Sequence, residues 1–265
     1  MEFVETGGLR IAYEQVGDGP PLVFVHSGAS DSRSWAPQLA DLSDEFTVVA
    51  WDEPGVGRSS ALPDDFGLTD YADGLAALIV TLDRGPAHIA GLSWGGTVVL
   101  ELYRRHPELV ASLILMDTYA GWKGSLAEEE VRARSVDART RLASPDGEFD
   151  LTIPGLFYGD PPAIFVPTLA AIAADVRQTS IERELTIMAE TDLSAVLPTI
   201  AVPTLLIWGQ HDARSPLTVA RQFEDAIPDA TLVVIEGAGH MSNLERPQRV
   251  NDAVRTFCRA HLTPK

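Results

Sequence analysis

One serine of the chain stands in a local sequence that favours a nucleophile. Ser93 is the central residue of GLSWG, after an apolar run typical of a buried strand and before a stretch with helical spacing. A sharp strand-to-helix turn would force this serine into a strained backbone conformation, and the flanking glycines avoid side-chain collisions there. Its hydroxyl would project at the carboxyl edge of a sheet, where open α/β folds bind ligands. Ser93 is therefore the candidate nucleophile.

A serine hydroxyl attacks at neutral pH only with a base and an acid that orients the base. Among six histidines, His240 lies in a glycine-rich loop, EGAGH, directly after the last apolar run, and is the candidate base. Asp212 in WGQHD follows the preceding run and is the preferred acid, because a short turn before Pro216 would hold its carboxylate rigidly. Asp117 follows an earlier run and stays open as the alternative acid.

These residues require a sheet that brings separate loops to one edge. Six short apolar runs are typical of strands buried on both faces, and helical patterns separate most of them. The runs are LVFV from Leu22, TVVAW from Thr47, AHIAGL from Ala87, SLILM from Ser112, TLLIW from Thr204 and TLVVIE from Thr231. The alternation predicts an α/β fold with a mainly parallel sheet covered by helices on both faces. FVETGGLRIAYEQV, which alternates with period two, predicts an antiparallel hairpin at the sheet edge.

One interval is too long for a single crossover helix. After the run that ends at Met116, the next strand candidate begins only at Thr204, and three helix-like stretches lie between them. We expect an inserted helical cap at residues 121–197, with a core domain formed by residues 1–120 and 198–265.

Composition fits one large hydrophobic core. The chain has 265 residues, of which 45% are hydrophobic, and a formal net charge of −18. This acidity repels nucleic-acid phosphates and anionic membranes, so we expect neither as a partner. No signal-peptide pattern and no apolar stretch of roughly 20 residues is present, which favours a cytoplasmic location. The expected partner is a small-molecule substrate, a homodimer stays open, and the single cysteine, Cys258, is expected to be buried.

Four motifs resemble the α/β-hydrolase fold superfamily, in its capped, esterase-like branch. They are HSGAS from His26, WDEPGVGRS from Trp51, GLSWGG from Gly91, and the WGQHD and GAGH segments near the end. The chain order Ser93, Asp212, His240 is also the order of that superfamily. The resemblance covers almost the whole chain and implies a cap after the sixth strand. No metal or organic cofactor is required by this chemistry, and no motif indicates one.

The resemblance also implies the donors of an oxyanion hole. In this superfamily one backbone N–H comes from the loop that begins with HG and the other from the residue after the nucleophile, which gives Gly28 and Trp94. Ser27 departs from the HG pattern, and its hydroxyl either faces the pocket or is structural. His26 is expected to support this loop. The DxPGxGxS motif is expected to fix the neighbouring turn through Asp52, Gly55, Gly57 and Ser59.

The hypothesis that follows is a serine hydrolase that cleaves a small, largely apolar carboxylic ester or lactone through an acyl-enzyme. A serine at the elbow disfavours dehalogenase and epoxide hydrolase chemistry, which needs an aspartate there. HSGASDSRSWAPQ also resembles 3-oxoadipate enol-lactonases, although a dicarboxylic lactone would need Arg33 or Arg214 to face the pocket.

Other activities share the same triad. Carbon–carbon bond hydrolysis and haloperoxidase-like perhydrolysis stay open, as does a ligand-binding receptor with little turnover. The substrate is expected to contact Ser27, Tyr119, Trp122 and Phe157.

Overall fold

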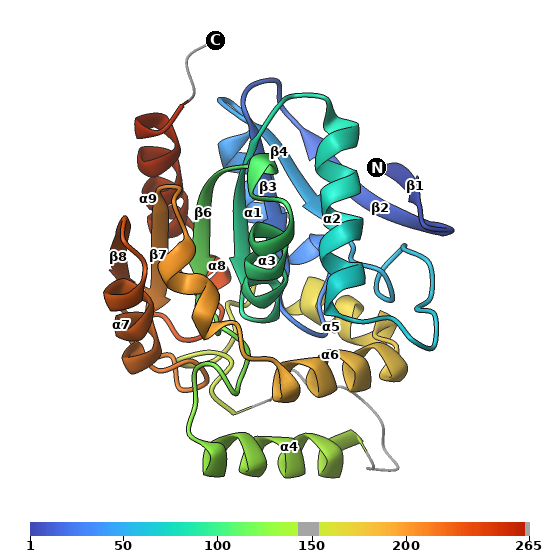
Figure 1. Ribbon diagram of the computed structural model, residues 1–265, viewed down its shortest axis with the longest axis vertical. Helices are drawn as coiled ribbons and strands as arrows, with labels where there is room; N and C mark the ends of the chain where they lie inside the picture. Colours follow the sequence, from blue (N-terminus) through green and yellow to red (C-terminus); the bar gives the residue numbers. More distant parts are fainter. Residues whose placement is uncertain (143–153, 263–265) are drawn as a thin grey trace.

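An eight-stranded sheet forms the centre of the molecule in the computed structural model, which describes residues 1–142 and 154–262 (Figure 1). The strands are β1 (Glu2–Thr6), β2 (Leu9–Val16), β3 (Pro21–Val25), β4 (Thr47–Trp51), β5 (Ala87–Leu92), β6 (Val110–Met116), β7 (Thr204–Gly209) and β8 (Ala230–Ile235). Their order across the sheet is β1-β2-β4-β3-β5-β6-β7-β8. All six apolar runs form strands, so the predicted fold class is confirmed.

The first two strands form the predicted antiparallel hairpin. Its turn consists of Gly7 and Gly8, whose φ angles of 57° and 80° suit glycine and match the twist of a tight hairpin. β2 is also antiparallel to β4, whereas the other neighbouring strands are parallel to one another.

Alternate residues of each parallel strand face two different hydrophobic clusters, because side chains alternate across a strand. In β3, Val23 and Val25 belong to one cluster, and Leu22 and Phe24 belong to the other. Both faces of β3 to β7 are therefore buried, which explains their continuous apolar runs, whereas the edge strand β8 is only partly buried. The helices over the first cluster are α2 (Leu68–Leu82), α3 (Trp94–Arg105) and α7 (Leu217–Ala226), and those over the second are α1 (Ala36–Leu42), α8 (Ser242–Glu245) and α9 (Pro247–Ala260).

Cys258 lies on α9 inside the second cluster and is fully buried, as predicted. Burial raises the pKa of its thiol to about 12.

The long interval between β6 and β7 contains three helices at one end of the sheet (Figure 1). They are α4 (Glu128–Leu142), α5 (Val166–Asp175) and α6 (Gln178–Glu190), followed by the 3-10 helix η3 (Ser194–Thr199). We keep the name cap for residues 121–197, of which residues 143–153 lie outside the described part. The division into a core domain and a cap domain stays a prediction.

Among the described residues, no helix has the length and apolar character that a membrane crossing requires.

The strand order changes direction at β3, and this change positions the candidate site. β3 pairs with β4 on one side and with β5 on the other, so the loops that follow β3 and β5 lie next to each other. Such a switch point is where open α/β sheets bind ligands. The loops after β6, β7 and β8 follow in order along the same edge. These five loops carry the residues of the candidate site.

Candidate active site

The turn between β5 and α3 holds Ser93 in a strained conformation. Its φ and ψ angles are 55° and −117°, a combination that costs a non-glycine residue about 1–3 kcal/mol. The backbone N–H of Ser93 donates to the carbonyl of Met116 at 2.9 Å, which ties the turn to the neighbouring strand β6. Ser93 is partly exposed, whereas Leu92 and Trp94 on either side are buried. The strand-to-helix turn thus has the strained backbone expected of an elbow, and its serine is partly accessible to solvent.

Two glycines of the elbow are required by close packing. A Cβ atom on Gly91 would lie 2.6 Å from the carbonyl oxygen of Gly95, the second residue of α3. A Cβ atom on Gly95 would collide with the carbonyl oxygen of Val25 at the end of β3. The elbow therefore packs directly against the strand that precedes the predicted oxyanion loop.

His240 and Asp212 are in direct contact. The Nδ1 atom of His240 lies 2.8 Å from Oδ2 of Asp212, and both side chains are buried. The other carboxylate oxygen, Oδ1, accepts the backbone N–H groups of Arg214 and Ser215 at 2.8 and 2.9 Å. With its proton on Nδ1, the imidazole keeps Nε2 available as a proton acceptor. The arrangement is that of a histidine base oriented by a carboxylate.

Asp117 lies beside Asp212 without taking its place against His240. Oδ1 of Asp117 accepts the backbone N–H of Gly209 at 2.7 Å, and Oδ2 accepts the hydroxyl of Ser242 at 2.6 Å. Burial raises the pKa of Asp117 well above its usual range, and the adjacent Asp212 raises it further. Of the two candidate acids, Asp212 is the one in contact with the histidine.

The loop after β3 has the supports that a rigid oxyanion loop needs. His26 is fully buried, with Nδ1 2.8 Å from the carbonyl of Ser27 and Nε2 accepting the backbone N–H of Glu53 at 3.2 Å. Burial lowers the pKa of His26, so the ring stays neutral and links two loops. Gly28 is partly exposed, and the Ser27 hydroxyl lies 4.0 Å from the sulfur of Met241.

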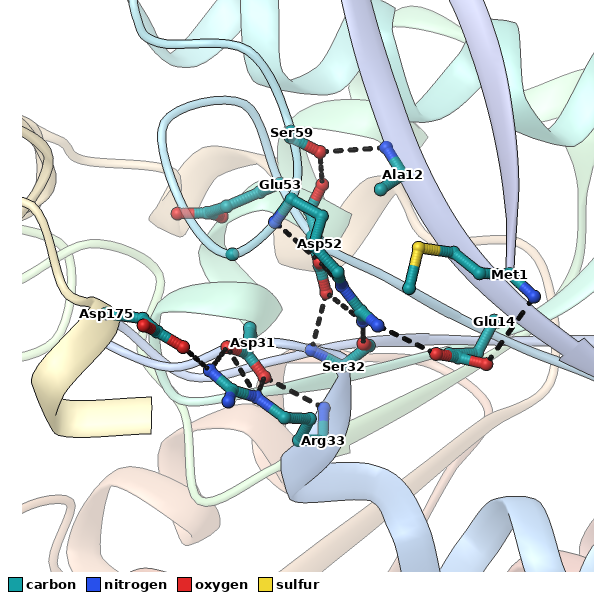
Figure 2. Close-up of polar contacts among 12 residues, drawn as sticks. Met1, Ala12, Glu14, Asp31, Ser32, Arg33, Asp52, Glu53, Ser59 and Asp175 are labelled. Carbon is teal, nitrogen blue, oxygen red and sulfur yellow. Dashed lines mark hydrogen bonds and ion pairs between the residues drawn. The ribbon is translucent and has the colours of Figure 1, made fainter. Parts of the chain in front are cut away.

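The DxPGxGxS residues form a structural network beside this loop (Figure 2). Asp52 accepts the backbone N–H groups of Ser32 and Arg58 at 3.0 and 2.9 Å, and the Arg58 guanidinium lies 2.8 Å from the same carboxylate. The Ser59 hydroxyl donates to the Asp52 carbonyl and accepts the backbone N–H of Ala12. Gly57 has φ of 50°, and a Cβ atom there would collide with the Asp52 carboxylate. These contacts fit the predicted architectural role.

Further arginines lie at the junction of this network with the cap. Figure 2 shows Arg33 between Asp31 and Asp175. Its guanidinium Nη2 lies 2.6 Å from Oδ2 of Asp31 and 2.7 Å from Oδ2 of Asp175. We call Arg33, Arg58, Arg177 and the carboxylate partners of Arg33 and Arg58 the arginine network. The three arginines, with Gly57 and Asp175, line a cleft of about 350 Å³. Arg33 is thus engaged in ion pairs at this cleft rather than directed at the candidate site.

The predicted substrate contacts are distributed over both clusters. Tyr119 and Trp122 are buried in the first cluster, where the Tyr119 hydroxyl donates to the Arg214 carbonyl and accepts a hydrogen bond from Arg134 at 2.8 Å. Phe157 is partly buried against the second cluster, and its backbone approaches Gly239, next to His240. Their role in substrate binding stays a prediction.

Two buried glutamates at the site were not predicted. Glu184 of α6 accepts the backbone N–H of Ala29 at 2.9 Å, and Glu53 accepts the indole N–H of Trp94 at 2.8 Å. One sequence signal existed, because Glu184 falls between Ile181 and Met188 on the buried stripe of an amphipathic helix. A carboxyl group in that position needs a polar partner inside the protein.

Within residues 1–142 and 154–262, no group of three or more His, Cys, Asp or Glu side chains is placed to hold a metal ion.

Sheet order, elbow and the five loops together define an α/β hydrolase. The model of the alpha/beta hydrolase family matches residues 22–253, and the chain belongs to that family. It is a hydrolase by its relatives as well as by its fold.

Three known proteins illustrate the relationship. The putative carbamate hydrolase RutD of Pseudomonas syringae is 33% identical over 92% of this chain and 95% of its own length. A thermophilic esterase from Thermogutta terrifontis superposes with a TM-score of 0.81 and 29% identity, over 99% of this chain and 100% of its own. The enol-lactonase from Burkholderia xenovorans superposes with a TM-score of 0.82 and 28% identity, over 97% and 100%. The predicted resemblance to the esterase and lactonase branch is confirmed.

Proposed function

We propose that the chain hydrolyses small carboxylic esters or lactones through an acyl-enzyme on Ser93. The observation that carries this proposal is the 2.8 Å contact between His240 and Asp212, at the sheet edge that also presents a strained, partly exposed serine. A serine that is activated by a histidine, with a carboxylate to orient the histidine, attacks acyl carbons on several unrelated folds.

In the proposed reaction, Oγ of Ser93 attacks the acyl carbon while Nε2 of His240 takes the hydroxyl proton. Asp212 holds the imidazole in the required tautomer and stabilises the imidazolium. The negative charge that develops on the acyl oxygen is bound by the backbone N–H groups of Gly28 and Trp94. The C–O bond then breaks, the leaving alkoxide takes the proton from His240, and an acyl-serine remains.

Water completes the cycle by the same route. His240 removes a proton from water as the water oxygen attacks the acyl-serine, and returns that proton to Oγ of Ser93 as the ester bond breaks. The products are a carboxylic acid and the free enzyme. For a lactone, the acid and the alcohol leave as one hydroxy acid.

We infer a largely apolar substrate because three of the four side chains proposed to contact it are aromatic. These are Tyr119, Trp122 and Phe157, and the fourth is Ser27 in the loop after β3. The Arg33 ion pairs with Asp31 and Asp175 argue against a role for this residue in binding a dicarboxylic lactone. The name of the RutD relative favours carbamates as a second substrate class, because the same attack applies to a carbamate carbonyl.

The test is hydrolysis of short p-nitrophenyl esters by the purified protein and by Ser93→Ala. We expect measurable turnover by the wild type, its loss in the variant, and covalent labelling of Ser93 by a fluorophosphonate seen by mass spectrometry. A panel of lactones, carbamates and ring-cleavage dienones, plus peracid formation from acetate and peroxide, then ranks the substrate classes. Tight binding of these compounds without turnover or labelling would instead indicate a receptor.

A further inference from the structure

Two buried glutamates connect the cap to both halves of the proposed oxyanion hole. Glu184 comes from the cap helix α6, and its Oε2 accepts the backbone N–H of Ala29, the residue after Gly28. Glu53 comes from the loop after β4, and its Oε2 accepts the indole N–H of Trp94. Gly28 and Trp94 are the residues that supply the two proposed oxyanion donors. Each half of the hole is thus tied to one of the two carboxyl groups.

The two carboxyl groups are also tied to each other. Glu53 is fully buried and Glu184 is 3% exposed, and the two lie within hydrogen-bonding reach. Their remaining oxygens, Oε1 of each, are buried and receive no N–H or O–H donor from other described residues. Two carboxylates this close cannot both be ionised at little cost, so a proton between them is required.

The surroundings place that proton on Glu53. Burial raises the pKa of Glu53 well above its usual range, with the charge of Glu184 as the next cause, and burial raises the pKa of Glu184 to about 7. The other ionisable groups near the pair are Tyr71 of α2, Arg183 of α6 and His26. Burial raises the pKa of Tyr71 and lowers that of His26, so both stay uncharged near neutral pH. Glu184 is therefore the group of this cluster that titrates there.

The Glu184 side chain also limits the position of the loop. A Cβ atom on Gly28 would lie 2.7 Å from Oε2 of Glu184, so the carboxyl group rests directly on the residue that supplies a donor. Ala29 has φ of 53°, a conformation that a non-glycine residue keeps only when its surroundings hold it. The hydrogen bond from Ala29 to Glu184 is one such restraint.

We propose that Glu184 is a positioning residue of the oxyanion hole, which together with Glu53 ties Ala29 and Trp94 to the cap. Since Glu53 already carries a proton, a second proton on Glu184 makes the pair neutral where the oxyanion forms. This inference rests on the function proposed above. A neutral Glu184 still accepts the Ala29 N–H through its carbonyl oxygen. An ionised Glu184 accepts it too, but places a negative charge beside the developing oxyanion and opposes it.

The direction of the pH effect follows from proton linkage. Because the pKa of Glu184 is about 7 with α6 packed against the loop after β3 and is ordinarily 4.5, this packing binds a proton at pH values between the two. The packing is therefore favoured most at low pH and weakens as the pH rises towards 7. We therefore expect kcat/KM to fall on the alkaline side, because Glu184 ionises there.

The decisive experiment compares the pH profiles of the wild type, Glu184→Gln, Glu53→Gln and Glu184→Ala on a p-nitrophenyl ester. Glu190→Gln, at an exposed position of the same helix, is the matched control. We expect Glu184→Gln to keep kcat within about threefold at low pH and to lose the alkaline fall, since an amide keeps the acceptor but carries no charge. We expect Glu184→Ala to lower kcat about tenfold with little change in KM, as a partial loss of oxyanion binding.

The outcomes separate this inference from the function on which it rests. A wild-type profile in Glu184→Gln, together with unchanged kcat in a folded Glu184→Ala, would overturn the positioning role. Should Glu184→Ala fail to fold, the profile of Glu184→Gln decides alone. If the wild type neither turns over esters nor labels at Ser93, the proposed function fails before any Glu184 variant is measured.

Discussion

Two buried carboxyl pairs stand on opposite sides of Ser93, and they differ in what they connect. Asp117 and Asp212 follow the neighbouring strands β6 and β7, so both belong to the core. Glu53 follows β4, beyond β3 on the other side of the elbow, whereas Glu184 belongs to α6 in the cap. Burial and the neighbouring carboxyl group raise the pKa of Asp117 in the first pair and the pKa of Glu53 in the second.

The difference lies in how each pair is held. Backbone N–H groups of Gly209, at the end of β7, and of Arg214 and Ser215, in the loop after it, hold the Asp117–Asp212 pair in place. The Glu53–Glu184 pair exists only while α6 lies against the loop after β3. A carboxyl pair held by backbone N–H groups keeps its orientation at any pH, whereas a pair formed by two segments that pack together makes their contact depend on protonation.

The largest expected effect distinguishes the members of the core pair. Asp212→Asn should lower kcat by about 10⁴-fold, because the amide favours the wrong tautomer of the histidine. Asp117→Asn should cost tenfold or less, because Asp117 contacts Gly209 and Ser242 rather than His240. Steady-state kinetics on a p-nitrophenyl ester measure both. Equal losses, or a larger loss in Asp117→Asn, would make Asp117 the acid.

The next effect concerns the stability contributed by Glu53 and Glu184, which we call the divided pair. With a pKa of about 7 in the folded protein against 4.5 ordinarily, Glu184 contributes stability that is complete below pH 4.5 and is lost as the pH rises to 7. The total is about 3 kcal/mol. Urea unfolding at pH 5 and pH 7.5 should show a smaller loss for Glu184→Gln than for the wild type. Parallel losses in the two proteins would contradict the raised pKa.

A smaller effect is expected from the indole that anchors the divided pair. Trp94→Phe removes the N–H that Glu53 accepts and should cost about 1–2 kcal/mol in unfolding free energy and a few-fold in kcat. Trp35→Phe is the matched control, because Trp35 is also buried but its indole N–H has no partner among the described residues. Equal losses of unfolding free energy in the two variants would mean that the hydrogen bond from Trp94 to Glu53 contributes little to stability.

The smallest effect contrasts the buried pair with the arginine network at the same junction. Asp175 is 58% exposed and its ion pair with Arg33 also links the cap to the core. Exposed pairs contribute below about 1 kcal/mol and weaken with salt. Asp175→Asn should therefore change the urea midpoint slightly at low salt and not at high salt, with kcat unaffected. A loss as large as that of Glu184→Ala would mean that the surface pairs hold the cap.

Sequence patterns predicted most of the core and the order of the candidate site. Strands such as β3 are buried on both faces, so their apolar runs are visible without knowledge of their neighbours. Ser93, Asp212 and His240 were located because each follows a strand, and parallel strands end at a common edge. The contact between His240 and Asp212 has the geometry that this placement required.

The divided pair was not predicted because the position of Glu184 on the buried stripe of its helix does not reveal its partner. Glu53 precedes a proline in a loop motif, and Glu184 lies in a helix that contains other glutamates, at exposed positions. Only the packing of α6 against the loop after β3 reveals that these two carboxyl groups meet. Partners from distant segments that share a proton leave no signal in either segment that identifies the other.

The single thiol of the chain has a practical consequence for following the cap. Cys258 is fully buried and its raised pKa leaves almost no thiolate near neutral pH, so maleimides should ignore it in the folded protein. A cysteine introduced as Glu190→Cys, at the exposed end of α6, would be labelled selectively on an otherwise natural background. A fluorophore there would report movement of α6 in real time without replacement of the native cysteine.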